Sequence, residues 1–217
     1  MRTSTQSYLT QVVERYPPLK ECIGPLYAAT EAMIDCFRRG NKLLACGNGG
    51  SAADCEHVVG ELMKAFLLRR HLEADQRLQL QTMYPQDAGY LIANLQRALP
   101  AISLVSQTAL MTAFGNDVSA DMIFAQQVLS YGQPGDILLA ISTSGNSKNI
   151  VYAAQIARLK KLTVLSLMGR KNGQLKDYSD IAIQVPSEVT YQIQEYHLPI
   201  YHCLCACVEN EFFGLEL

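Results

Sequence analysis

The stretch that most constrains the fold is an apolar run followed directly by a glycine-rich turn and the start of a helical pattern. Leu43–Cys46 is typical of a short buried strand, and Gly47-Asn48-Gly49-Gly50-Ser51 follows it. Glycines let the backbone turn sharply and approach a ligand closely. The free N–H groups at a helix N-terminus favour an anion, most often a phosphate. An ordinary strand-to-helix turn is the alternative, and the pattern matches neither common nucleotide-binding motif.

A second strand-to-helix junction carries hydroxyl groups. Asp136–Ile141 is another apolar run, and Ser142-Thr143-Ser144-Gly145-Asn146-Ser147 separates it from a helical pattern that begins near Lys148. These hydroxyls and backbone donors carry no positive charge, so they suit a phosphate held by neutral hydrogen bonds. A serine-rich helix cap is the alternative. Two such junctions in one chain favour phosphate binding.

The order of apolar patterns predicts an α/β fold. Further strands are expected at 100–105, 162–167 and 180–185, and helices at 121–130 and 191–212. Strands that alternate with helices argue for a parallel, doubly wound sheet with sites at the carboxyl ends of its strands. Residues 4–39 are expected to form a helical arm, within 1–40, that breaks at Pro17-Pro18 and could break again at Gly24-Pro25.

Composition limits the classes of function. The chain has 217 residues, 49% of them hydrophobic, and a formal net charge of −2. One domain, 1–217, with a full-sized core is expected. No basic patch indicates nucleic acid, no apolar run is long enough to span a membrane, and no signal peptide opens the chain. We therefore expect a cytoplasmic protein that binds neither nucleic acid nor a membrane. Its seven cysteines are expected to be buried and reduced.

One helical segment carries a pair suited to metal or acid–base chemistry. His57 and Glu61 are four residues apart, so they share a helix face. A solvated polar pair has the same spacing. The position two turns beyond the glycine-rich turn makes the pair a candidate for chemistry.

The last predicted helix carries Gln194, His197 and His202, with Pro199 between them. His197 is interpreted as a structural residue, because a lone helical histidine is usually a packing residue. Eight residues span roughly 12 Å of a straight helix, whereas ligands lie about 2.0–2.3 Å from a zinc ion. The family resemblance described below implies that Gln194 and His202 bind one zinc ion, and two residues so far apart on one straight helix cannot easily do so. Either Pro199 interrupts the helix or the two residues come from different subunits.

These motifs together resemble the SIS (sugar isomerase) domain and, within it, the phosphoheptose isomerases. The resemblance runs from about Asn41 to the C-terminus, except for residues 67–98. The matching motifs are Cys46–Ser51, His57-x-x-x-Glu61, Gly115-Asn116-Asp117, Ile141–Ser147 and Ile193-Gln194-Glu195-x-His197-x-x-x-x-His202.

The resemblance implies a three-layer, flavodoxin-like SIS fold and an aldose–ketose isomerase. Such an enzyme converts sedoheptulose 7-phosphate, or a similar ketose phosphate, to the heptose 7-phosphate through an ene-diol. The resemblance implies that Glu61 moves the proton between C1 and C2 and that His202 is the opposing acid/base. It implies one Zn²⁺ per subunit on His57, Glu61, Gln194 and His202. Substrate contacts are implied for Asn48, Gly49, Gly50, Ser51, Glu61, Asn116, Asp117, Ser142, Thr143, Ser144, Ser147 and Gln194.

Three further expectations concern partners and alternatives. We expect a homo-oligomer, a tetramer, with its sites at subunit interfaces. The insertion at 67–98 is compatible with a lid over the sugar site or a surface loop at a subunit edge, and its Arg69 and Arg70 with binding of a phosphate or carboxylate. The functional alternative is a non-catalytic SIS protein that senses a phosphosugar or binds a replication initiator. Glu61 favours the enzyme, because initiator-binding members lack this glutamate.

Overall fold

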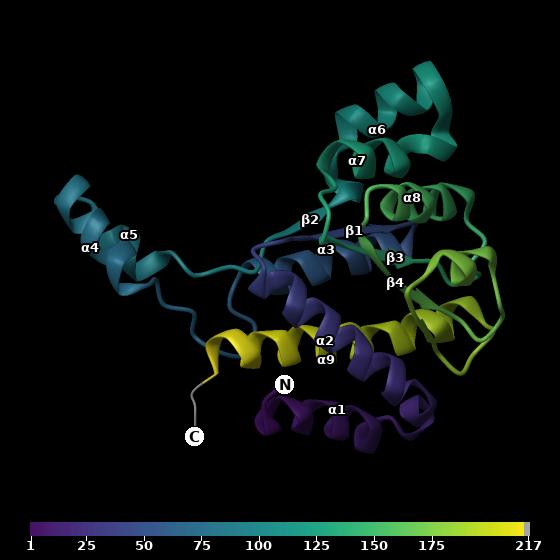
Figure 1. Cartoon of the computed structure of the whole chain (residues 1–217), viewed down its shortest axis with the longest axis horizontal. Helices are drawn as coiled ribbons and strands as arrows, with labels where there is room; N and C mark the ends of the chain where they lie inside the picture. The colour runs from purple at the N-terminus through teal and green to yellow at the C-terminus, as the bar shows by residue number, and fades with distance from the viewer. Residues whose placement is uncertain (215–217) are drawn as a thin grey trace.

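The computed structural model describes residues 1–214 and contains one parallel sheet with helices on both faces (Figure 1). Its five strands have the spatial order β2-β1-β3-β4-β5. The order reverses between β1 and β3, where a doubly wound sheet opens a crevice at its carboxyl edge. The expected α/β fold is therefore confirmed. The strands are β1 (Leu43–Gly47), β2 (Ala101–Ser103), β3 (Ile137–Ile141), β4 (Thr163–Met168) and β5 (Ile181–Gln184).

Alternate residues of the central strands enter two separate cores, because successive side chains of a strand point to opposite faces. Leu43 and Ala45 join the core under the N-terminal and C-terminal helices. Leu44 and Cys46 join the core on the other face. The first face is covered by α1 (Thr3–Arg15), α2 (Ile23–Arg38), α3 (Gly50–Met63) and α9 (Thr190–Phe213), the second by α7 (Ile123–Tyr131) and α8 (Lys148–Leu159).

The helical arm breaks once. A 3₁₀ turn, η1 (Pro17–Cys22), separates α1 from α2, so the break at Pro17-Pro18 is confirmed. The second break considered, at Gly24-Pro25, does not occur. Pro25 lies in the first turn of α2, where the missing N–H has no intrahelical partner to lose. Both helices of the arm pack on α9.

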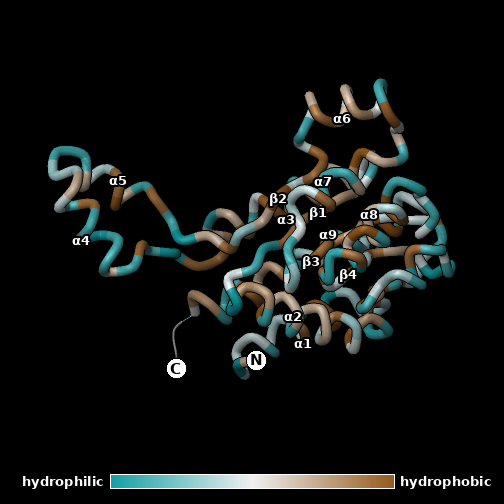
Figure 2. The backbone as a smooth tube through the Cα atoms, turned by 45° about the horizontal axis from the view of Figure 1, so that its top comes forward, coloured by the Kyte–Doolittle hydropathy of each residue, from teal (hydrophilic) through white to brown (hydrophobic). Residues whose placement is uncertain are grey.

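Two segments project from the body of the molecule. Within the insertion, α4 (Ala74–Met83) and α5 (Ala88–Asn94) form a hairpin that extends away from the sheet (Figure 1). Helix α3 begins at the carboxyl end of β1 and runs away from it, and the hairpin follows the far end of α3. Within one chain, the hairpin therefore does not cover the carboxyl end of β1 as a lid would. The second projection is α6 (Thr108–Phe114) with the turns η3 (Gly115–Ser119) and η4 (Ala120–Met122) (Figure 2).

The remaining expectations about packing concern cysteines and membranes. All seven cysteines are free thiols, and their predicted burial is confirmed. Over residues 1–214, no helix combines the length and the apolar character that crossing a bilayer requires.

Candidate functional site

Two loops meet at the carboxyl ends of β1 and β3, the neighbouring strands at which the order of the sheet reverses. Residues 48–49 connect β1 to α3, and residues 142–147 connect β3 to α8. A reciprocal pair of amide hydrogen bonds, 2.9 Å each, joins Asn48 to Asn149 in the first turn of α8. The two loops are therefore held as one surface.

A positive φ requires one glycine of the first loop, and a close approach requires the glycine at the end of β1. Gly49 has a φ of +58° and caps α3 without a side chain, and a Cβ on Gly47 would lie 2.5 Å from the Ser51 carbonyl oxygen. No side chain caps α3 or α8, and among residues 1–214 the N–H groups of Gly50, Lys148 and Asn149 have no acceptor, so these donors at the two helix starts are open to a ligand. This arrangement can bind an anion through neutral donors.

Hydroxyl groups complete the loop surface. Ser142 donates to the Ser147 hydroxyl over 3.2 Å, and the Ser144 hydroxyl accepts from the Asn146 N–H over 3.2 Å. Ser144 is exposed and Thr143 half-buried, whereas Ser142 is buried. Ser144 is thus the more accessible of the two serines that begin the loop.

A second cluster lies farther along α3, where this helix packs on α9. His57 Nε2 lies 3.3 Å from Glu61 Oε1 and 3.5 Å from His202 Nε2. The side chains of His57 and Glu61 are 43% and 12% exposed, so the cluster is open to solvent on the histidine side. Burial lowers the pKa of His202 and the neighbouring His57 lowers it further, while Glu61 opposes both effects. Three residues implied as ligands or acid/base groups therefore meet within one chain.

Gln194 lies elsewhere in the same chain. A Cβ on Gly50 would be 2.5 Å from Gln194 Nε2, so this side chain rests against the first turn of α3, beside the two loops. His57 is seven residues farther along α3, about 10 Å in axial rise. Helix α9 continues through Pro199, which excludes the interruption considered above. Gln194 can thus contact a ligand at the loops but does not join the histidines of its own chain.

The cluster fits zinc in donor type and pair spacing but not as a complete site. Ligand atoms of one tetrahedral zinc ion, about 2.0–2.2 Å from the metal, lie about 3.3–3.6 Å from each other. The two measured distances at His57 Nε2 fall in that range. Among residues 1–214, however, no three His, Cys, Asp or Glu side chains are grouped so that they could hold a metal ion.

Charged neighbours hold the end of α3 that carries Glu61. Lys64 donates to Glu61 Oε2 over 2.7 Å. Arg70, which is buried, donates to the Glu61 and Leu62 carbonyls over 2.9 and 2.6 Å and to Glu209 over 2.8 Å. Of the two arginines considered as anion ligands, Arg70 thus binds a carboxylate of its own chain and is not available to a phosphate. Arg69 is exposed.

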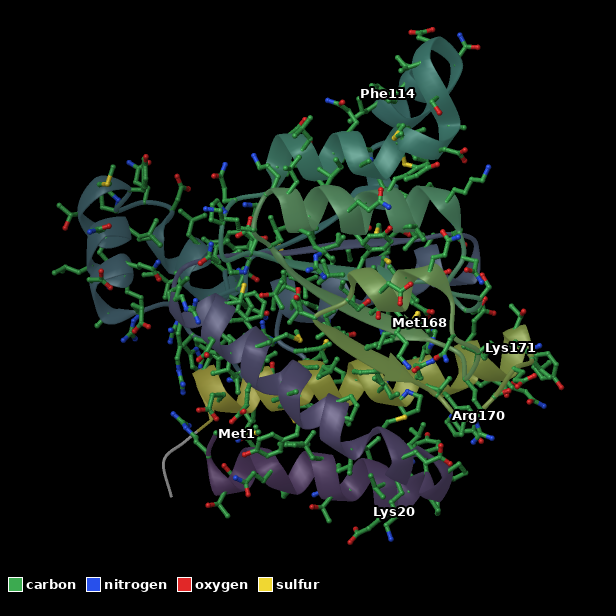
Figure 3. All side chains as sticks on the ribbon, turned by 45° about the vertical axis from the view of Figure 1, so that its right-hand side comes forward. Met1, Lys20, Phe114, Met168, Arg170 and Lys171 are labelled. Atoms are coloured by element: carbon green, nitrogen blue, oxygen red, sulfur yellow. The ribbon has the colours of Figure 1, made fainter. Side chains whose placement is uncertain are left out.

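Asn116 and Asp117 lie on the second projection, the segment of α6, η3 and η4, and not at the loops. They are exposed in η3, where Asn116 donates to Asp117 over 2.9 Å. Figure 3 shows Phe114 on this arm, whereas Met168, Arg170 and Lys171 lie at the carboxyl end of β4 and beyond it. The structure does not bring this implied pair to the other site residues of its own chain.

Sequence reasoning missed two residues beside the cluster. The Tyr201 hydroxyl lies 3.1 Å from His57 Nδ1 and donates to Asp54 Oδ1 over 3.3 Å. Asp54 precedes His57 by three residues, a spacing that places both on one face of α3. That spacing was visible in the sequence, but the partner on α9 was not.

The comparisons with known proteins show the family and the fold of the chain. The model of the SIS domain matches residues 7–90 and 78–169. A phosphoheptose isomerase from Shewanella loihica is 42% identical over 188 residues, which are 85% of this chain and 82% of that protein. The solved phosphoheptose isomerase GmhA from Neisseria gonorrhoeae superposes with a TM-score of 0.73 at 31% identity, covering 94% of this chain and 96% of that one. A phosphoheptose isomerase from Francisella tularensis gives 0.71 at 31% identity, covering 97% and 100%.

Proposed function

The chain belongs to the SIS domain family, among the phosphoheptose isomerases, and we propose that it is an aldose–ketose isomerase acting on sedoheptulose 7-phosphate or a similar ketose phosphate. The product is the corresponding heptose 7-phosphate. Relatives that carry the name phosphoheptose isomerase favour this activity over the non-catalytic sensor or initiator-binding protein.

One observation carries the proposal: a surface of neutral anion donors and an acid–base cluster lie along the same helix, α3. Its N-terminus faces the loops, and His57 and Glu61 follow about two and three turns later. A phosphate held at the loops would therefore place the far end of an extended sugar near the cluster. This separation supports a substrate of six or seven carbons over a short phosphosugar.

The loops bind and orient the substrate in this mechanism. Backbone N–H groups at the start of α3 and α8 and the hydroxyls of Thr143, Ser144 and Ser147 would donate to the phosphate. Asn48 would remain in its pair with Asn149, so the binding surface changes little on loading. Fixing the phosphate end holds C1 and C2 in one orientation relative to the cluster.

Proton transfer is assigned to Glu61 and His202. Glu61 removes a proton from C1 of the ketose, and the same proton or one from solvent is delivered to C2 after an ene-diol forms. His202 exchanges the proton between the carbonyl and hydroxyl oxygens. Lys64, exposed and bonded to Glu61 Oε2, must leave one carboxylate oxygen free for this step.

Zinc is part of the proposal. His57, Glu61 and His202 of one chain would hold it together with Gln194 from another copy of the chain, one ion per subunit, in agreement with the donor types and with the two pair spacings. When bound, Zn²⁺ polarises the substrate carbonyl and stabilises negative charge on the oxygens. Metal analysis of gently purified protein, with and without added zinc, tests this part separately from the activity.

A homo-oligomer, a tetramer, would complete the site. Gln194 is directed to the loops of its own chain, so a partner subunit is the remaining source of a fourth ligand. His202 also lines an apolar groove of about 450 Å³ between α1 and α9, with Tyr8, Phe66 and Leu198. The α4–α5 hairpin exposes Leu78, Met83 and Tyr90. These surfaces are suited to covering by another copy.

A mixing experiment tests the shared site. Glu61→Gln chains are mixed with Gln194→Ala chains under conditions that let subunits exchange. Recovered activity is expected, because some mixed sites regain both wild-type residues. The matched control mixes Glu61→Gln with His202→Ala, which should not recover because the structure joins both residues to His57 of one chain. No recovery in the first mixture, with exchange verified by mass spectrometry, would place Glu61 and Gln194 in one chain.

The function itself is tested by turnover. The purified full chain, supplied with zinc, is incubated with a panel of ketose phosphates of six and seven carbons, and the aldose product is measured by NMR. Conversion of a seven-carbon substrate is expected. Binding of every substrate without conversion would support the sensor class and overturn the proposal.

A further inference from the structure

The second ring nitrogen of His57 is engaged in a chain of hydrogen bonds that runs away from the acid–base cluster. His57 Nδ1 lies 3.1 Å from the Tyr201 hydroxyl, and that hydroxyl donates to Asp54 Oδ1 over 3.3 Å. The Tyr201 side chain is almost fully buried, and its ring meets that of His57 edge to face with centroids 5.5 Å apart. The contact is therefore built into the packing of α9 on α3.

The direction of the protons follows from the groups present. A carboxylate can only accept, and the phenol has a single proton to give. Asp54 Oδ2 is buried without a partner among the described residues, so the hydrogen bond from Tyr201 to Oδ1 is the one that this carboxylate receives from them. An unsatisfied buried acceptor is costly. The phenol proton thus goes to Asp54, and the phenol oxygen accepts a proton from His57 Nδ1.

Glu61 competes for the same histidine from the other side. Its Oε1 lies 3.3 Å from His57 Nε2 and could accept a proton there. Glu61, however, already receives a 2.7 Å hydrogen bond from Lys64. Among residues 1–214, no cationic side chain forms an ion pair with Asp54. Losing the hydrogen bond from Tyr201 would therefore cost Asp54 more than losing the His57 contact would cost Glu61.

We propose that Asp54 and Tyr201 are positioning residues that hold His57 with its proton on Nδ1 and its Nε2 lone pair facing Glu61 and His202. The role of that lone pair, as a metal ligand or proton acceptor, rests on the proposed function, whereas the position of the proton does not. Residues that orient a histidine through its second nitrogen fix both the tautomer and the ring plane.

The test reads the tautomer directly. The chain has four histidines, so long-range ¹H–¹⁵N spectra of histidine-labelled, metal-free protein contain few signals. The His57 signal is identified by its loss in His57→Gln. Wild-type protein is expected to carry the proton on Nδ1, and Tyr201→Phe to shift it toward Nε2. A wild-type proton on Nε2, or a tautomer unchanged in Tyr201→Phe, overturns the inference.

A matched control and a second readout separate this role from packing. Tyr196→Phe removes a hydroxyl from the same helix outside this chain of bonds and should leave the His57 tautomer unchanged. Zinc affinity, measured by competition with a chromophoric chelator, should fall roughly 10- to 100-fold in Tyr201→Phe and stay unchanged in Tyr196→Phe. Equal losses in both variants would contradict the positioning role. If Tyr201→Phe does not fold, the wild-type spectrum alone decides.

The outcome is distinguishable from that of the proposed function. A wild-type chain that converts no ketose phosphate but shows the Nδ1 proton, lost in Tyr201→Phe, would refute the isomerase and support this inference. An active isomerase with the proton on Nε2 would do the reverse.

Discussion

The two ends of α3 differ in how much of a site one chain provides. At the N-terminal end, two loops are joined by a reciprocal amide pair, and the helix N–H groups are open to an anion. Farther along, His57, Glu61 and His202 meet within 3.5 Å contacts, but the fourth implied ligand lies about 10 Å back along the helix. In the proposed function, binding of the phosphate is thus a property of the fold of one chain, whereas the chemistry would depend on how helices, and subunits, pack.

The largest expected effect is a loss of catalysis at the acid–base cluster with phosphosugar binding at the loops retained. Glu61→Gln should lower kcat by roughly 10²- to 10⁴-fold, because a positioned base contributes about that factor. Affinity for the phosphosugar should change little if the phosphate binds at the loops, as proposed. Glu56→Gln, an exposed neighbour on α3, is the control for kinetics and calorimetry. Loss of binding in Glu61→Gln would mean that Glu61 also holds the substrate, so that the two ends of α3 form one binding site.

The two histidines of α9 sharpen the comparison, because one belongs to the cluster and the other to the core. His197 is fully buried, and burial lowers its pKa to about 4. The unfolded chain therefore binds the proton more tightly, so the stabilising contribution is present above pH 6.5 and is lost as the pH falls toward 4. The loss should be about 3 kcal/mol in the free energy of unfolding.

Denaturant titrations between pH 7 and 4 measure that loss. His197→Leu should flatten the pH dependence, while His71→Leu, at an exposed position of the insertion, should leave it unchanged. An equally steep dependence in His197→Leu would assign the acid sensitivity to other groups.

A smaller effect tests the first end. Ser144→Ala should weaken phosphosugar binding by about 1.5–3 kcal/mol, the contribution of a hydrogen bond to a charged group. The thermal midpoint should stay the same, because Ser144 is exposed. Ser142→Ala removes a buried hydroxyl that donates to Ser147, so it should lower stability as well as affinity. Unchanged affinity in titration calorimetry with Ser144→Ala would remove this hydroxyl from the phosphate site.

The smallest effect tests whether the loops act as one surface. Asn149→Ala removes the amide pair with Asn48. The expected loss in binding is about 0.5–1.5 kcal/mol, because the pair is at the surface and contributes order more than energy. Arg158→Ala, at the other end of α8, provides the matched control. A loss as large as that of Ser144→Ala would mean that Asn149 contacts the ligand itself.

The two ends of α3 also differ in how much of each could be predicted from the sequence. Strand–turn–helix junctions are local, so β1, β3 and both loops could be located from apolar runs and glycines. The spacing of His57 and Glu61 likewise fixed a shared helix face. The contacts of Tyr201 and of Arg70 with Glu209 could not be predicted, because they depend on how α9 packs on α3.

Two predictions failed or changed for physical reasons. Pro25 does not break α2, because a proline is tolerated in the first turn of a helix. Arg70 was considered as an anion ligand, but its guanidinium is buried against Glu209 and the α3 carbonyls. The outcomes at Pro25 and Arg70 both depend on where the residue lies in its helix or loop. The composition of the segment does not specify that position.

Solvent-proton exchange during turnover tests the central claim most directly. The wild-type chain with zinc is incubated with sedoheptulose 7-phosphate in D₂O, and the sugar is followed by NMR. We predict the aldose phosphate, with deuterium at C2 in the fraction of turnovers in which the proton on Glu61 exchanges with solvent, and neither product nor label in Glu61→Gln, which still binds the substrate. Binding of the sugar by the wild-type chain without isomerisation or label would contradict an enzyme that binds at one end of α3 and moves a proton at the other.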